Sequence, residues 1–172
     1  MSEDVYIALG SNVEPEKNIV QACALLAEKV SLRFVSTFYK TKALERPEQS
    51  DYRNGVVHVA TPLSPLRLKL DVLREIEDRL GRVRTEDPYA SRTIDLDIVV
   101  FDDFVMNEDD LVLPDPELRE RSFVAVPLLE LAPDLVLADT GEALRSIRSA
   151  QARSELEPDI ELTEKVKARL NL

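Results

Sequence analysis

The sequence predicts an α+β protein with a ferredoxin-like βαββαβ core, in which an antiparallel sheet has helices packed on one face and helical additions follow at the C-terminus. Three observations favour this fold. Short β-branched runs and helix-period segments follow in the order strand, helix, strand, strand, helix, strand. The chain has 172 residues, 44% of them apolar, which is enough to bury one core. No repeat or linker interrupts it, so we expect a single domain over residues 1–172.

The first half of the core is predicted as a strand, a helix and a hairpin. The apolar run Val5–Leu9 is typical of a central strand. Apolar positions then recur at helical spacing over Pro15–Val30, with the proline well placed in a first turn. Two further strands are expected at Phe34–Tyr39 and Tyr52–Ala60, and the polar loop Glu45–Asp51 joins them as a hairpin.

The second half repeats the helix and the strand. Ser64 is a predicted N-cap for a helix that ends near Gly81. A polar loop over Arg82–Arg92 leads into the strand Thr93–Phe101. Beyond it we expect a polar connection, a short helix and a charged helical tail, at residues 102–116, 123–131 and 142–172.

The composition excludes several classes of protein. A net charge of −11 argues against general nucleic-acid binding, because neutralising phosphates requires a basic face. No apolar run approaches the ~18 residues of a membrane span. The start Met1–Asp4 lacks a signal pattern, so we expect a cytoplasmic protein that contacts no membrane. Cys23 and His58 are each the single residue of their kind, so we expect structural roles for both and neither a disulfide framework nor a zinc cluster.

The strand Thr93–Phe101 carries a possible metal site. Alternate side chains of a strand share a face, so Asp95 and Asp97 point one way and their apolar neighbours point into the core. Their Cα atoms lie about 6.6 Å apart at ~3.3 Å per residue, and the carboxylates can converge on one ion or two. Hard oxygen ligands favour magnesium or manganese, which usually complete their shell with phosphates and water. A nucleoside triphosphate is the natural partner.

Cations and a flat-ligand site accompany these aspartates. Five arginines occur between Arg74 and Arg92, a local basic focus in an acidic chain that suits an anionic ligand. The alternative interpretation is a solvated rim of ion pairs with nearby acidic residues. Tyr52 and Asn54 share one strand face and offer an aromatic surface beside an amide, a pair suited to a flat heterocycle. No Walker-type phosphate loop is present.

Five short motifs follow one another along the chain. They are YIALGSN at Tyr6–Asn12, FYKT at Phe38–Thr41, DYRN at Asp51–Asn54, LGRVR at Leu80–Arg84 and RTIDLDI at Arg92–Ile98. In this combination the chain resembles the 6-hydroxymethyl-7,8-dihydropterin pyrophosphokinases of folate biosynthesis. The resemblance extends from about Val5 to Pro133.

This resemblance implies an activity and a set of site residues. The β,γ-diphosphate of ATP is transferred to the hydroxymethyl group of the reduced pterin, and AMP is released. The family pattern implies two magnesium ions on Asp95 and Asp97 and catalytic roles for Arg82 and Arg92. It implies nucleotide contacts from Arg84, Arg92, Ile98 and Arg121, and pterin contacts from Thr41, Lys42, Leu44, Tyr52, Asn54 and Phe123.

Several residues depart from the family pattern. Asp115 stands where a histidine is common, and Ala90–Ser91 stand where Gly-Pro often precedes the arginine. Asp110 replaces a basic nucleotide contact of some members, and Tyr89 occupies a position that can carry tryptophan. A carboxylate that faces ATP phosphate is unfavourable by on the order of a kcal/mol, so these departures concern ATP affinity rather than reaction type.

Two other functions remain open from the sequence. One is a ferredoxin-like module that binds a pterin with weak turnover or none. The other is a metal-dependent kinase or nucleotidyltransferase for a different flat heterocycle, which Tyr52, Asn54 and Phe123 disfavour. For every reading we expect a monomer that acts on small molecules, with the choice between magnesium and manganese left open.

Overall fold

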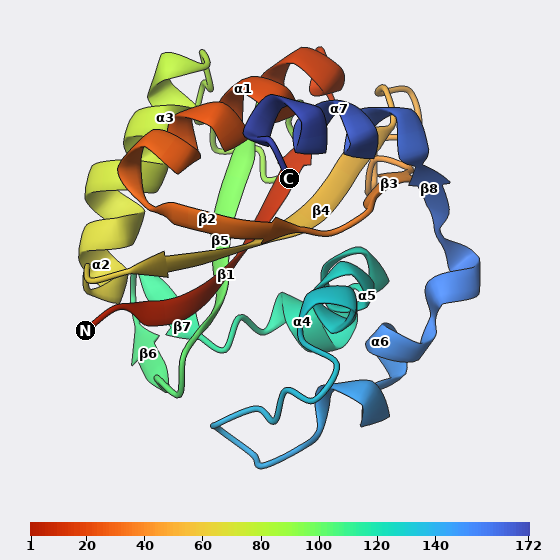
Figure 1. Ribbon diagram of the computed structural model, residues 1–172. Helices are drawn as coiled ribbons and strands as arrows, with labels where there is room; N and C mark the ends of the chain where they lie inside the picture. Colours follow the sequence, from red (N-terminus) through yellow and green to blue (C-terminus); the bar gives the residue numbers. More distant parts are fainter.

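An antiparallel sheet is the central layer of the molecule, and helices cover both of its faces (Figure 1). The computed structural model describes all residues, 1–172. Five strands follow the order β5-β1-β4-β3-β8, and β2 also pairs with β4. The predicted antiparallel sheet with helices is thereby confirmed. The strands span Glu3–Ser11 (β1), Ser31–Val35 (β2), Phe38–Thr41 (β3), Tyr52–Thr61 (β4), Asp95–Phe101 (β5) and Glu157–Asp159 (β8).

Strand β1 lies between β4 and β5 and sets the register of both. Gly10 is paired with Asn54 of β4 on one side and with Asp95 of β5 on the other. Ala8 is likewise paired with Val56 and Asp97. Because side chains alternate along a strand, these residues share one face of the sheet.

The opposite face of the sheet packs against the helices that the sequence predicts. Helix α1 spans Pro15–Lys29, and the second predicted helix is a continuous run of α2 (Pro65–Arg67), a π-helical stretch (Leu68–Leu73) and α3 (Arg74–Arg79). The Ser64 side chain accepts the N–H of Arg67, as expected of an N-cap. Gly81 follows the helix with φ at +79°, a left-handed backbone that glycine adopts without strain. Cys23 is buried in this core, as predicted.

Helices also cover the face that carries Gly10 and Asp95, which corrects the expectation of helices on one face. Figure 1 shows α4 (Glu117–Glu120), α5 (Ser122–Leu131) and α6 (Arg148–Gln151) on this side, across the sheet from α1 and α3. The reason is that this face is also apolar along much of its area. Val56, Val99 and Val100 point to it and form a second core with α5.

The predicted strand Phe34–Tyr39 is wrong in its continuity. It is two strands, β2 and β3, which both pair with β4 and are separated at Ser36 and Thr37. The Ser36 hydroxyl accepts the N–H of Val56 at 2.9 Å, so a side chain completes the hydrogen bonding where the strand breaks.

Two C-terminal predictions also need correction. The connection 102–116 contains a hairpin of β6 (Met106–Glu108) and β7 (Leu111–Leu113). The tail 142–172 is not helical throughout, because β8 adds to the edge of the sheet beside β3 before α7 (Ile160–Leu170). Helix α7 returns to the layer of α1, as Figure 1 shows. None of the helices has the length and apolar character needed to cross a membrane.

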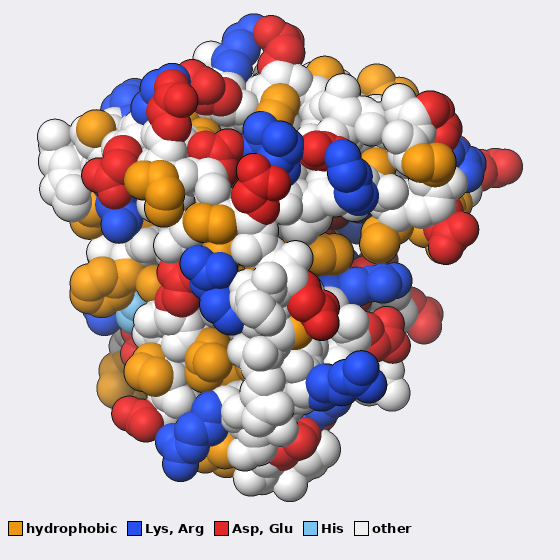
Figure 2. All heavy atoms as spheres, turned by 90° about the vertical axis from the view of Figure 1, so that its right-hand side faces the viewer, with side chains coloured by type: hydrophobic (Ala, Val, Ile, Leu, Met, Phe, Trp, Pro, Cys, Tyr) orange, Lys and Arg blue, Asp and Glu red, His pale blue; other side chains and the backbone are white.

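Acidic and basic side chains are interspersed on the face that carries β8. Figure 2 shows both signs mixed over this face, without a continuous basic surface. His58 of β4 is stacked on Tyr6 with ring centroids 4.8 Å apart, and its Nε2 lies 2.8 Å from Asp4 Oδ1. The structural role expected for it stays a prediction, which these contacts with neighbouring side chains support.

Gly55 leaves the space that the buried Phe38 ring fills. A Cβ at this position would lie 2.6 Å from two ring carbons of Phe38. We expect Gly55→Ala to lower the free energy of unfolding by about 1–3 kcal/mol through overpacking, measured by urea denaturation. Ser31→Ala, at an exposed position of β2, is the control and should change it by about 0.5 kcal/mol or less. Equal stability of the two variants would contradict this packing.

Candidate active site

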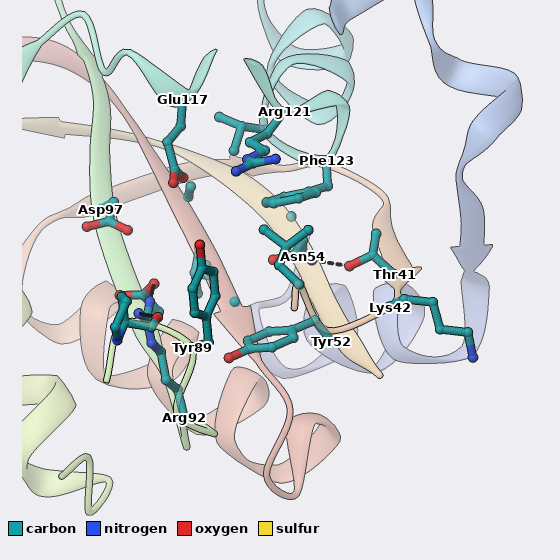
Figure 3. Close-up of a pocket in the computed structure, with 18 of the residues that line it drawn as sticks. Thr41, Lys42, Tyr52, Asn54, Tyr89, Arg92, Asp97, Glu117, Arg121 and Phe123 are labelled. Atoms are coloured by element: carbon teal, nitrogen blue, oxygen red, sulfur yellow. Dashed lines mark hydrogen bonds and ion pairs between the residues drawn. The ribbon is translucent and has the colours of Figure 1, made fainter. Parts of the chain in front are cut away.

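A cavity of about 320 Å³ opens between the sheet and the start of α5 (Figure 3). Ala8 and Gly10 of β1 form its floor. Most of the predicted site residues line it: Thr41, Lys42, Leu44, Tyr52, Asn54, Arg92, Asp95, Asp97, Arg121 and Phe123. Residues from β1, β3, β4, β5 and α5 therefore meet in one place, although they are far apart in the sequence.

Three predicted residues lie outside this wall. Arg82 stands behind Asp95, and its Nη1 atom donates to Asp95 Oδ1 at 2.7 Å. Arg84 is directed away, with ion pairs to Glu77 at 3.0 Å and to Asp78 at 2.9 Å. Ile98 packs in the core of the other sheet face and lies on the wall of a second, adjoining cavity. Arg84 thus forms ion pairs with nearby acidic residues, as in the alternative interpretation of the sequence. Arg92 instead pairs with Asp95 on the cavity wall.

The two aspartates differ in their surroundings. Both are on the cavity side of β5, while Leu96 between them is buried in the opposite core, as the alternation predicts. Asp95 accepts hydrogen bonds from Arg82 and Arg92. Asp97 forms no ion pair, although it is open to the cavity. Withdrawal from bulk water and then repulsion by Asp95 and two further carboxylates, Asp115 and Glu117, raise the pKa of Asp97 well above its ordinary value.

Glu77 is an acidic residue next to the site that was not among the predicted site residues. It is 3% exposed and accepts hydrogen bonds from Arg82, from Arg84 and, at 3.4 Å, from the backbone N–H of Leu96. A carboxylate next to Ile76, on the apolar side of a helix, is the local signal that indicates it. Glu77 thereby balances the two arginines behind Asp95.

The other end of the cavity is lined by two aromatic rings and an amide. Figure 3 shows Phe123 from α5 and Tyr52 from β4 projecting into it with Asn54 between them. The Asn54 Nδ2 atom donates to Thr41 Oγ1 at 2.8 Å, which fixes the amide orientation. Lys42 points outward and pairs with Asp51 at 3.1 Å.

Three loops, residues 12–14, 42–51 and 80–94, meet at Asn12. No single local signal in the sequence identifies this residue. Its Nδ2 atom donates to Gln49 Oε1 at 3.2 Å, and its Oδ1 atom accepts the N–H of Arg92 at 2.8 Å. Arg46, in the loop 42–51, pairs with Asp87 at 3.0 Å, and its guanidinium lies 5.8 Å from the Tyr89 ring centroid. These contacts hold Tyr89 at the cavity, into which its ring projects (Figure 3).

A second cavity of about 230 Å³ adjoins the first at Asp97. It is lined by residues of β5, the β6–β7 hairpin and the start of α4: Lys69, Leu96, Asp97, Ile98, Asp109, Asp110, Leu111, Val112, Asp115 and Pro116. Asp115 Oδ1 accepts the N–H of Glu117 at 2.9 Å. Burial, and next the charge of Asp95, raise the pKa of Asp115 above its ordinary value. Lys69 and Glu117 were not predicted as site residues.

Two adjoining cavities that share Asp97, with Arg92 and Arg121 on the wall of the first, are typical of an enzyme that acts on small molecules. The family model of the 7,8-dihydro-6-hydroxymethylpterin-pyrophosphokinases (HPPK) matches residues 6–133. The chain therefore belongs to this family.

Relatives of known function agree with this assignment. The 2-amino-4-hydroxy-6-hydroxymethyldihydropteridine pyrophosphokinase of Haemophilus influenzae is 41% identical over 138 residues, which cover 78% of this chain and 85% of that protein. The enzyme of Pseudomonas aeruginosa is 39% identical over 142 residues, with 81% and 86% covered. The folic acid synthesis protein fol1 of Pneumocystis carinii is 37% identical over 150 residues, which are 84% of this chain and 20% of that longer protein.

Solved structures share the fold. A Plasmodium falciparum HPPK-DHPS structure, the A437G variant with SDX-DHP, aligns over 100% of this chain and 47% of its own, with a TM-score of 0.63 and 14% identity. An HPPK-DHPS in complex with substrates aligns over 90% and 44%, with a TM-score of 0.64 and 14% identity. This chain thus spans less than half the length of these structures.

Asp97 is expected to reduce the stability of the protein in the absence of ligands. Its pKa is higher in the folded than in the unfolded state, so its ionisation disfavours folding at neutral pH, and this penalty vanishes below the ordinary aspartate pKa. With chelator and no nucleotide, we expect Asp97→Asn to raise the free energy of unfolding near neutral pH and progressively less toward about pH 4. Denaturant titrations at several pH values measure this, with Asp103→Asn as an exposed control. A pH-independent gain would contradict the expectation.

Proposed function

We propose that this protein transfers the β,γ-diphosphate of ATP to the hydroxymethyl oxygen of 6-hydroxymethyl-7,8-dihydropterin, giving AMP and the pterin diphosphate in folate biosynthesis. Membership of the pyrophosphokinase family supports this reaction. The observation that carries it is the position of Asp97, which lies on the wall of both cavities. A group transferred between two bound substrates must pass such a shared point.

The first cavity is proposed as the pterin site. The rings of Tyr52 and Phe123 offer stacking surfaces, and Asn54, held by Thr41, offers an amide to the hydrogen-bonding edge of the pterin. Lys42 and Leu44 border the same end of the cavity and complete the proposed pterin contacts. A ligand in this position places its opposite end toward the aspartates.

The second cavity is proposed as part of the nucleotide site. Ile98 and Leu111 supply apolar surface there, and Arg92 and Arg121 lie on the adjoining wall of the first cavity, where they can meet phosphates. Arg84 is 44% exposed, and we propose that it leaves its exposed partner Asp78 to contact the nucleotide.

The carboxylates of Asp95 and Asp97 fit divalent magnesium, and we propose that they hold two such ions. No group of three or more metal-binding side chains is present, so protein ligands alone do not complete a site. This donor set suits magnesium, which takes further oxygens from substrate phosphates and water. When bound, the metal neutralises phosphate charge and orients the transferred group.

The residues of the chain perform the remaining work of the proposed reaction. The hydroxymethyl oxygen forms a bond to the β-phosphorus, the bond from that phosphorus to the oxygen of AMP breaks, and the hydroxyl proton is released. Arg82 and Arg92 leave Asp95 for the diphosphate and stabilise its charge in the transition state. The loops joined at Asn12 exclude water, which prevents hydrolysis.

Further assignments belong to the same proposal. The strand order β5-β1-β4-β3 is that expected for a ferredoxin-like core, and both apolar cores pack on this one sheet, which supports a single domain over residues 1–172. We also propose a cytoplasmic monomer that binds small molecules and no nucleic acid, consistent with the net charge of −11.

The reaction is tested by mixing the protein with magnesium, ATP and hydroxymethyldihydropterin and following AMP. We expect AMP to form only with pterin, and Asp97→Ala to lower turnover at least about a hundredfold, because transition-state charge loses its metal ligand. Asp103→Ala, near the end of the same strand, should keep the wild-type rate. Absence of pterin-dependent AMP would instead support the binding module without turnover.

Asp115 is expected to weaken ATP binding. Its carboxylate is in the second cavity near Asp97, where a phosphate group adds further negative charge. We expect Asp115→His to lower the KM for ATP about three- to tenfold, with little change in the KM for pterin, since one unfavourable charge is removed. Glu108→Gln, an exposed change on β6, is the control. An unchanged or raised KM for ATP would show that Asp115 is directed away from the nucleotide.

A further inference from the structure

A polar contact behind the first cavity ties α5 to the sheet. Tyr39 of β3 is 1% exposed, and its hydroxyl donates a hydrogen bond to the carboxylate of Glu130, in the last turn of α5. The other Glu130 oxygen accepts the backbone N–H of Thr37 at 2.9 Å. The Glu130 carboxylate thus connects α5 to Tyr39 of β3 and to Thr37, the residue just before β3.

The tyrosine is held as a hydrogen-bond donor. Burial and then the bond to Glu130 raise the pKa of Tyr39 to about 12, so the hydroxyl keeps its proton at neutral pH. Its ring packs in a small cluster with Val126 and Leu156, and Phe123 lies against the same cluster. The Arg153 guanidinium lies 4.9 Å from the ring centroid. Arg153 and Leu156 belong to the segment beyond the matched residues 6–133.

This cluster connects the two sides of the cavity. Tyr39 is paired with Asn54 across the β3–β4 ladder, so both side chains are on the α5 face of the sheet. Glu130 and Phe123 are at opposite ends of the ten-residue helix α5. Neither Tyr39 nor Glu130 lines the cavity, whereas Asn54 and Phe123 do. A change in the Tyr39–Glu130 contact can therefore affect a bound ligand only by changing the distance between α5 and the sheet.

We propose that Tyr39 and Glu130 are positioning residues that set the distance between Phe123 on α5 and Tyr52 and Asn54 on β4, and thereby the affinity for the reduced pterin. This inference rests on the proposed function, because it takes the first cavity as the pterin site. Most of the proposed nucleotide residues are on β5 and at the start of α4, away from this contact, and only Arg121 lies at the start of α5. The contact consequently acts mainly on the pterin and much less on ATP.

The test compares Tyr39→Phe and Glu130→Gln with wild type in steady-state kinetics. Pterin dissociation constants are measured by pterin fluorescence with magnesium and a non-hydrolysable ATP analogue. We expect Tyr39→Phe to raise the pterin KM and dissociation constant about tenfold, with the KM for ATP within about twofold, because a hydrogen bond to a charged group is lost. In Glu130→Gln the side-chain carbonyl can accept the N–H of Thr37 while the amide N–H donates to the Tyr39 hydroxyl oxygen, so this variant should show a smaller change of the same kind.

Tyr6→Phe is the matched control, because Tyr6 is on the same face of the sheet and its ring stacks on His58. We expect it to alter neither KM. A Tyr39→Phe enzyme whose pterin and ATP constants are unchanged, or move equally, would overturn the positioning role even if its unfolding temperature fell. If Tyr39→Phe does not fold, the same criterion applies to Glu130→Gln. A wild-type protein without pterin-dependent AMP formation would contradict the proposed function itself.

Discussion

The small side chains that β1 presents toward α5 are the constraint on which the candidate site depends. Gly10 lies between Asn54 and Asp95 in the register, and Ala8 lies between Val56 and Asp97. Adjacent strands are about 4.8 Å apart, so the flat-ligand residues and the carboxylates are two strand spacings apart with a hollow between them. A Cβ on Gly10 would lie 2.8 Å from Asn54 Oδ1, so a larger residue would displace the Asn54 amide that Thr41 holds. The cavity exists because β1 carries only the small residues Ala8 and Gly10 on this face at this point.

Charge is distributed unevenly around this hollow. The chain carries a net charge of −11, yet Arg82 and Arg92 gather around Asp95, where Glu77 and Asp95 hold them in ion pairs. Asp97 has no such partner, and withdrawal from bulk water together with repulsion by Asp95 and other nearby carboxylates raises its pKa well above the ordinary value. A bound triphosphate would draw Arg82 and Arg92 away from Asp95, which frees that carboxylate for a metal ion. Nucleotide and metal binding are therefore expected to favour each other through the same arginines.

Helix α5 closes the hollow on its second side. Its apolar residues form a core with Val56 and Val99, so the helix that carries Phe123 is positioned by ordinary hydrophobic packing. The Tyr39–Glu130 contact adds a directional tie to that packing. Residues outside the matched family region, Arg153 and Leu156, complete this support from the C-terminal segment.

The sequence by itself determined the local structure and the family of this protein. Alternation in β5 told which side chains share a face, the spacing after Pro15 predicted α1, and Gly81 marked a helix end, because these signals depend on neighbours along the chain. Ordered motifs predicted most of the cavity residues. Only the tertiary structure decided which partners meet. The break at Ser36, the addition of β8, the covering of both sheet faces, and the roles of Asn12 and Glu77 depend on contacts between distant segments, and no local pattern specifies those contacts.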